Sequence, residues 1–141
     1  MSLWKGLLAA IAITGMAFLA SQAGGKDVSS KLIGNWTILD EKGNPVAQSD
    51  SVPTISFKPG QRLQAFSGCN RMMGSWSIDS DVLSIAHLPT TRMMCSEDAI
   101  AFEEHFGESL AAVQGFSVTQ DGLQLRDSAG AVLLVLKKRI S

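Results

Sequence analysis

The sequence PTISFKPGQRLQAFS, residues 53–67, predicts two antiparallel strands joined by a tight turn. Ile55 and Phe57 alternate with polar residues before the turn, and Leu63 and Ala65 do the same after it. Alternation with a period of two places successive side chains on opposite faces of a strand. In the KPGQ segment between the two runs, proline fixes φ and glycine permits a positive φ. The stretch therefore predicts a hairpin with one apolar face and one polar face.

Strand-like patterns continue in both directions from this hairpin. The further runs are residues 32–39, 74–79, 82–86, 115–119, 123–125 and 131–136. The last of these, AVLLVL, has no polar residue, which suits a central strand covered on both faces. The runs give five strands, then a helix, then three strands, without the alternation of strand and helix that parallel sheets need. We therefore expect an α+β fold, in which a curved, half-barrel-like antiparallel sheet of about eight strands carries one packed α-helix.

The period changes over residues 96–113, which predict that helix. Ser96 is a suitable N-cap, and the acidic residues Glu97 and Asp98 favour the positive end of the helix dipole. Apolar residues recur at spacings of three and four, at Ala99, Phe102, Phe106, Leu110 and Val113. We expect this stripe to pack on the sheet and the acidic residues beside it to be solvated; these are Glu103, Glu104 and Glu108.

The first residues are typical of an export signal. Lys5 precedes an uncharged apolar run over residues 6–20, and Ser21-Gln22-Ala23 has the small-x-small pattern of a cleavage site. We expect residues 1–23 to be a signal peptide, residues 24–31 a flexible leader and residues 32–139 the folded domain. The mature protein would then be periplasmic or secreted. The alternative is an uncleaved anchor in the inner membrane, although the run is shorter than the roughly 20 residues of a spanning helix.

Composition narrows the classes of function. The 141 residues carry a net charge of −1, which argues against the bulk basic surface of a nucleic-acid-binding protein. Cys69 and Cys95 are the two cysteines, and in an exported domain they predict a disulfide. The alternatives are two buried free thiols, a reactive thiol or half of a metal site. Because neither cysteine has a partner at zinc-binding spacing, we expect no metal and no cofactor.

Two segments resemble a known family. They are residues 67–74, SGCNRMMG, and residues 88–95, LPTTRMMC. Gly68-Cys69-Asn70 followed by Gly74, and then Thr91, Met93 and Cys95 just before a helix, resemble the META domain family of HslJ-like heat-shock proteins. The resemblance covers about residues 32–138. It implies an α+β fold, a place in the cell envelope and a link to stress tolerance, and it supplies no catalytic residues. Many bacterial relatives are lipoproteins, whereas this chain has no cysteine near its signal exit to carry a lipid.

The same segments hold the candidate binding residues. Arg71 and Arg92 could each hold a carboxylate or phosphate with two parallel hydrogen bonds. They could equally be surface charges or pair with Glu97 and Asp98. Turn-forming and capping roles are the simpler explanation for the remaining polar and small residues. The set that we take as family motif and candidate binding residues is Gly68, Asn70, Arg71, Gly74, Thr91, Arg92 and Met93, gathered around the Cys69–Cys95 crosslink.

Three functions are compatible with these observations. We favour a non-enzymatic exported protein that binds an envelope protein, a peptide or a small molecule. The second is a membrane-anchored component of a larger envelope assembly, held or transiently associated through residues 6–20. The third is an enzyme in which Cys69 is the nucleophile and His87 or His105 the base. The third is disfavoured because a disulfide would occupy Cys69 and because no nucleophile-elbow, Walker A or HExxH motif is present.

Overall fold

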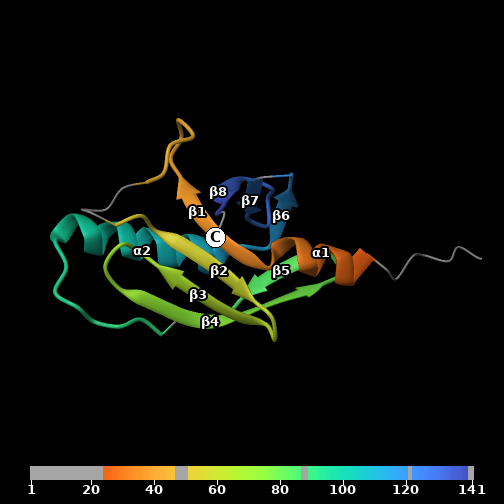
Figure 1. Cartoon of the computed structure of the whole chain (residues 1–141), viewed down its shortest axis with the longest axis horizontal. Coiled ribbons are helices and arrows are strands. Elements are labelled where there is room, and N and C mark those ends of the chain that lie inside the picture. The colour runs from red at the N-terminus through yellow and green to blue at the C-terminus, as the bar shows by residue number, and fades with distance from the viewer. Residues whose placement is uncertain (1–23, 47–50, 87–88, 121, 140–141) are drawn as a thin grey trace, which may run out of the picture.

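The computed structural model describes residues 24–46, 51–86, 89–120 and 122–139. Within these ranges the chain forms two helices, α1 (Gly24–Leu32) and α2 (Glu97–Ala112), and eight strands (Figure 1). The strands are β1 (Gly34–Leu39), β2 (Thr54–Lys58), β3 (Arg62–Phe66), β4 (Arg71–Asp79), β5 (Val82–Ile85), β6 (Gly115–Val118), β7 (Gly122–Arg126) and β8 (Val132–Lys138). The predicted order of five strands, a helix and three strands is confirmed. The predicted signal peptide, residues 1–23, and His87 lie outside the described residues.

The strands form a sheet that nearly closes into a barrel. Their order is β5-β4-β3-β2-β1-β8-β7-β6, and neighbours are antiparallel throughout. The two ends of this order approach each other, because the Leu83 N–H of β5 donates to the Gln114 carbonyl, 3.1 Å away, directly before β6. Closure of this kind removes strand edges that would otherwise pair with other chains. The predicted α+β fold is confirmed.

The hairpin that opened the sequence analysis forms as predicted. β2 and β3 pair with Thr54 opposite Phe66 and Phe57 opposite Leu63, and positive φ values of 75° at Gly60 and 60° at Gln61 turn the chain. The indole N–H of Trp76 donates to the Lys58 carbonyl at 3.1 Å, which ties β4 to this turn. Ile55, Phe57, Leu63 and Ala65 face the interior, whereas the polar side chains and Phe66 face outward.

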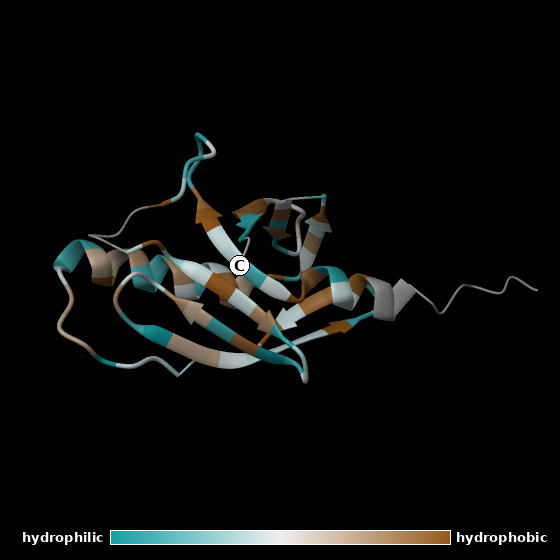
Figure 2. Cartoon of the chain, in the orientation of Figure 1, coloured by the Kyte–Doolittle hydropathy of each residue, from teal (hydrophilic) through white to brown (hydrophobic). Residues whose placement is uncertain are grey.

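The interior holds the apolar side chains of the strands and of α2. Figure 2 shows brown, apolar residues alternating with paler or teal ones along the strands. Trp36, Phe57 and Phe106 are the largest of the fully buried side chains. On α2, Phe106 and Leu110 are buried and Phe102 is half-buried, with its ring centroid 5.7 Å from that of Phe106. Ser96 caps the helix by accepting the Ala99 N–H at 3.2 Å. The predicted cap and buried face of α2 are therefore confirmed.

The segment before the sheet differs from the prediction. Residues 24–32 form α1, where we expected a flexible leader and the start of the first strand. Leu32 is completely buried, and its carbonyl accepts the indole N–H of Trp36 at 2.8 Å. Burial of Leu32 and this hydrogen bond fix the end of the helix on the core. The first strand consequently begins at Gly34, whose φ of 144° suits glycine.

Two strand boundaries also differ. β4 begins at Arg71 rather than at Gly74, because residues 71–75 pair with β3. β8 continues through Lys137 and Lys138, which we expected to lie in a solvated tail, because both residues pair with β1. Among the described residues, no helix has the length and apolar character needed to cross a bilayer.

Candidate functional site

A disulfide joins the two motif segments. Cys69 and Cys95 are bonded, with their Cα atoms 6.2 Å apart, and the described residues contain no free cysteine. Cys69 stands two residues before β4, and Cys95 directly precedes the N-cap of α2. The crosslink therefore holds the start of a core strand against the start of the helix, as the sequence predicted.

The segment before α2 runs alongside β4 and extends the sheet. The Thr91 N–H donates to the Arg71 carbonyl at 3.0 Å, and the Met73 N–H donates to the Pro89 carbonyl at 3.1 Å. The Thr91 hydroxyl accepts the Arg71 N–H at 3.0 Å. These bonds cover the edge of β4 that β5 leaves open, so the two motif segments form one paired unit.

Asn70 is the centre of a buried hydrogen-bond network. Its side-chain oxygen accepts the Met93 N–H at 2.7 Å and the Thr91 hydroxyl at 3.3 Å. Its side-chain N–H donates to a Glu103 carboxylate oxygen at 3.2 Å and lies 3.5 Å from the Cys95 sulfur. Asn70 is only 4% exposed, so these partners take the place of water. The backbone group that the Asn70 side chain satisfies, the Met93 N–H, is 23 positions away in the sequence.

Glu103 does not behave as the sequence suggested. We expected a solvated carboxylate, but it is half-buried, and its second oxygen accepts the Ser67 hydroxyl at 2.8 Å. Ser67 is completely buried and in turn accepts the Asn70 N–H at 3.2 Å. Glu103 thus links α2 to the start of β4. The sequence signal for its partial burial is that Glu103 directly follows Phe102, at the border of the apolar stripe of α2.

The two motif glycines, Gly68 and Gly74, occupy different kinds of backbone position. Gly68 has a φ of 102°, a conformation that side chains disfavour, so it permits the turn into Cys69 as expected. Gly74 lies within β4 opposite Leu63, not at a strand end as we expected. By the alternation of β4 it shares the inward face with Met72 and Trp76.

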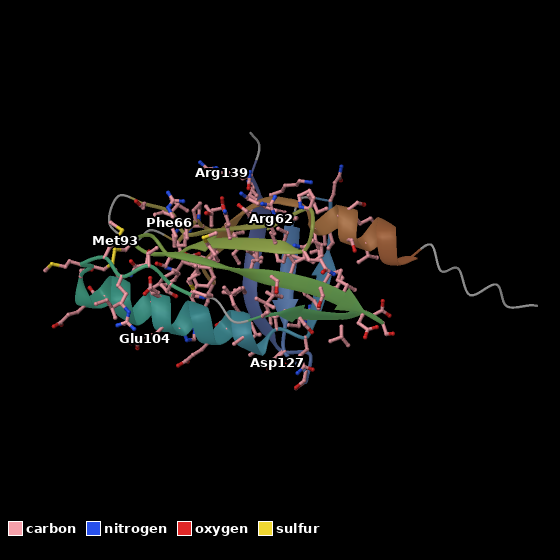
Figure 3. The ribbon with its side chains drawn as sticks, turned by 90° about the horizontal axis from the view of Figure 1, so that it is seen from below. Arg62, Phe66, Met93, Glu104, Asp127 and Arg139 are labelled. Atoms are coloured by element: carbon pink, nitrogen blue, oxygen red, sulfur yellow. A yellow bond between two sulfur atoms is a disulfide. The ribbon has the colours of Figure 1, made fainter. Side chains whose placement is uncertain are left out.

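The two arginines point to different sides of the sheet instead of forming one site. The Arg71 guanidinium carbon lies 5.3 Å from the centroid of the Phe66 ring, on the outer face. Arg92 borders a hollow of about 380 Å³ on the α2 side, together with Asn70, Met93 and Glu103. Figure 3 shows Phe66 on the upper side of the molecule and Glu104 on the lower side, at α2. The expectation that both arginines gather at the crosslink is wrong.

A groove lies beside this network, between α2 and the sheet. Its volume is about 300 Å³, and Thr90, Glu103 and Glu104 also border the hollow that Arg92 lines. The lining consists of apolar and small residues along the floor and glutamates along α2: Met72, Ile85, Ala86, Thr90, Glu103, Glu104, Gly107, Glu108 and Ala111. Glu104 and Glu108 are exposed, which leaves two carboxylates on one rim.

The structure describes two of the three residues considered for cysteine catalysis, Cys69 and His105. Cys69 is in the disulfide, and His105 is exposed on α2. In the part of the chain that the structure describes, no group of three His, Cys, Asp or Glu residues is placed to hold a metal ion.

Comparisons with known proteins agree on the fold. The model of the META domain family matches residues 30–140. An NMR structure of a protein from Burkholderia xenovorans is 22% identical, with a TM-score of 0.66 over 82% of this chain and 88% of that one. A DUF4847-family protein from Bacteroides vulgatus is 14% identical, with a TM-score of 0.58 over 81% of this chain and 99% of that one. No curated protein matches the chain. At these identities the structural likeness establishes the fold alone.

Proposed function

This chain belongs to the META domain family, and we propose that it is a non-enzymatic, exported protein of the cell envelope that supports stress tolerance by binding a peptide segment of another protein. The observation that carries the proposal is the groove between α2 and the sheet. Its apolar floor and its rim of glutamates suit a segment in which Lys or Arg stands next to apolar side chains.

The walls of the groove are held in place before any ligand arrives. The disulfide and the Asn70–Glu103 hydrogen bond fix α2 against β4, and Glu103 lines the groove itself. A site that is already rigid loses less conformational entropy when a ligand binds. This supports a role in recognition for the motif residues, through the groove that they shape.

The state of the cysteines supports both export and the absence of cysteine catalysis. A disulfide is typical of oxidising compartments such as the periplasm. A cysteine nucleophile reacts as a thiolate, and the bond between Cys69 and Cys95 leaves no thiolate at either position. The predicted signal peptide over residues 1–23 also supports export.

Complementation under heat stress tests this function. In cells that lack the chain, we expect the wild-type gene to restore survival and the E104Q/E108Q variant to fail, because it removes both rim charges. E41Q/D81N is the matched control, since it also removes two exposed carboxylates but at turns away from the groove. Equal survival with both variants, at equal protein levels in the envelope, would exclude the groove as the working site.

A further inference from the structure

The outer face of the sheet, on the side opposite α2, carries several basic residues. Outward positions alternate along β1, β2, β3, β8 and the first half of β4, and the strand register aligns them across the sheet. One such row consists of Arg71, Phe66, Thr54, Thr37 and Lys137, each opposite the next. The described basic residues of this outer face are Lys58, Arg62, Arg71, Lys137 and Arg139.

No Asp or Glu occupies an outward position of this outer face among the described residues up to Ser75 of β4. Asp79 has the same phase, but it stands four residues beyond Ser75, roughly 13 Å away along the strand. Five acidic residues lie on α2, and the other described ones lie mostly in turns: Glu97, Asp98, Glu103, Glu104 and Glu108, and then Asp40, Glu41, Asp79, Asp81 and Asp127. Figure 3 shows this separation, with Arg62 and Arg139 on the upper side and Glu104 on the lower side. The outer face of these strands is therefore locally basic although the net charge of the chain is −1.

Two of the arginines of the outer face border the same hollow. Arg71 and Arg139 border one shallow hollow of about 600 Å³, together with Thr37, Thr54 and Phe66. β4 and β8 are four strand positions apart, so the two arginine backbones are separated by about 19 Å along the sheet. The two side chains therefore reach the same hollow from well-separated strands, an arrangement that suits a ligand or surface with more than one negative group.

Apolar side chains lie among these charges. Met73 is 59% exposed on β4, and Val52 is 39% exposed at the edge of the same hollow. Phe66 packs beneath the Arg71 guanidinium and holds it on the outer face. Basic residues interspersed with exposed apolar ones are typical of proteins that rest on the headgroup region of a bilayer.

We propose that the outer face of the sheet docks on the surface of an anionic lipid bilayer, with each basic residue near a separate lipid phosphate. The proposal does not depend on the groove beside α2, which lies on the other side of the sheet. It also differs from anchoring through residues 6–20, because that segment is uncharged and its insertion does not require anionic lipids.

Vesicle co-sedimentation of the full chain, as purified from the cells that produce it, tests the proposal. The probes are vesicles of phosphatidylcholine alone and vesicles of equal parts phosphatidylglycerol and phosphatidylcholine. We expect binding to the anionic vesicles to exceed binding to the neutral ones and to fall as salt screens the charges. The R71Q/R139Q variant should lose about 30-fold in partition to anionic vesicles, since each basic residue near such a surface contributes a factor of about five.

Two further variants test whether binding depends on positive charge at positions 71 and 139, and not on guanidinium geometry or on basic residues elsewhere. R71K/R139K should bind like the wild type, because a bilayer surface responds to charge and not to guanidinium geometry. K31Q/K42Q removes two exposed basic residues elsewhere and should lose much less than R71Q/R139Q. Equal, salt-insensitive binding of the wild type to both kinds of vesicle would overturn the proposal, even if a variant failed to fold. Release of the protein from anionic vesicles by millimolar inorganic phosphate at constant ionic strength would also overturn it, in favour of a small-anion site.

Discussion

Asn70 shows how a single buried side chain can connect three parts of the molecule. It follows the disulfide cysteine, accepts a backbone N–H from the segment before α2 and donates to a carboxylate on α2 itself. Each bond is modest in net terms, but a buried group that loses its partner costs about 1–3 kcal/mol. Removal of the Asn70 side chain would take the partner away from the Met93 N–H and from one of the two Glu103 carboxylate oxygens at the same time.

We expect Asn70→Ala to lower the free energy of unfolding by about 3 kcal/mol for that reason. Asn35→Ala is the matched control. Asn35 also accepts one hydrogen bond, from the Ser56 hydroxyl, but it is exposed, so the loss should stay below about 1 kcal/mol. Urea denaturation of both variants measures the difference, and equal losses would contradict a central role for Asn70.

The hydrogen bond between Asn70 and Glu103 can be tested by exchanging the amide and the carboxylate between the two positions. Asn70→Asp should destabilise the fold, because it places a second carboxylate against that of Glu103. Adding Glu103→Gln should recover most of the loss, since the new amide can donate to the new carboxylate. A double-mutant cycle measures this coupling, and a value near zero would show that the two residues do not interact in solution.

At the scale of elements, α2 depends on its buried aromatic face. Phe106 is 1% exposed, so Phe106→Ala should lower the free energy of unfolding by about 3–5 kcal/mol. Glu104→Ala, on the exposed side two residues earlier, should change it by less than about 0.5 kcal/mol. Thermal denaturation followed by circular dichroism compares the two. Similar losses for both would mean that the buried face is assigned wrongly.

Most elements could be predicted because their own residues determine them. The alternation in β2 and β3 and the capped apolar stripe of α2 are visible within each segment. The elements that were missed depend on partners that are remote in sequence. α1 ends where Leu32 enters the core, and the start of β4 becomes a strand because it pairs with β3.

The candidate site was predictable to the same extent. The disulfide and the meeting of the motif segments followed from the presence of two cysteines, the predicted export signal and the family resemblance. The separation of Arg71 from Arg92 could not be predicted, because the alternating pattern begins only at Gly74, after Arg71. Once β4 is extended to Arg71, alternation places Met72 inward and Arg71 outward. The contact of Glu103 with Ser67 joins residues 36 positions apart and has no local signal.

At the scale of the whole molecule, the disulfide closes a loop across the sheet and α2. Cys69 and Cys95 are 26 positions apart, which corresponds to about 3.5 kcal/mol of stabilisation by restriction of the unfolded chain. We expect C69S/C95S to fold and to lose roughly this amount in urea denaturation. A reductant should lower the stability of the wild type but leave the double variant unchanged. Two thiols that alkylate readily in the native wild-type protein would refute the bridge.

The position of β8 in the sheet has a consequence for how the chain acquires its fold. β1, the first strand, lies between β2 and β8, so the first strand to be synthesised waits for the last one before both its edges are paired. Contacts between residues so distant in sequence form slowly, because a long loop must close before they stabilise anything. Until residues 132–138 emerge from the ribosome, the edge of β1 stays open and the core around Trp36 and Leu136 stays incomplete. The sheet of this topology is therefore completed only after its last strand has been synthesised.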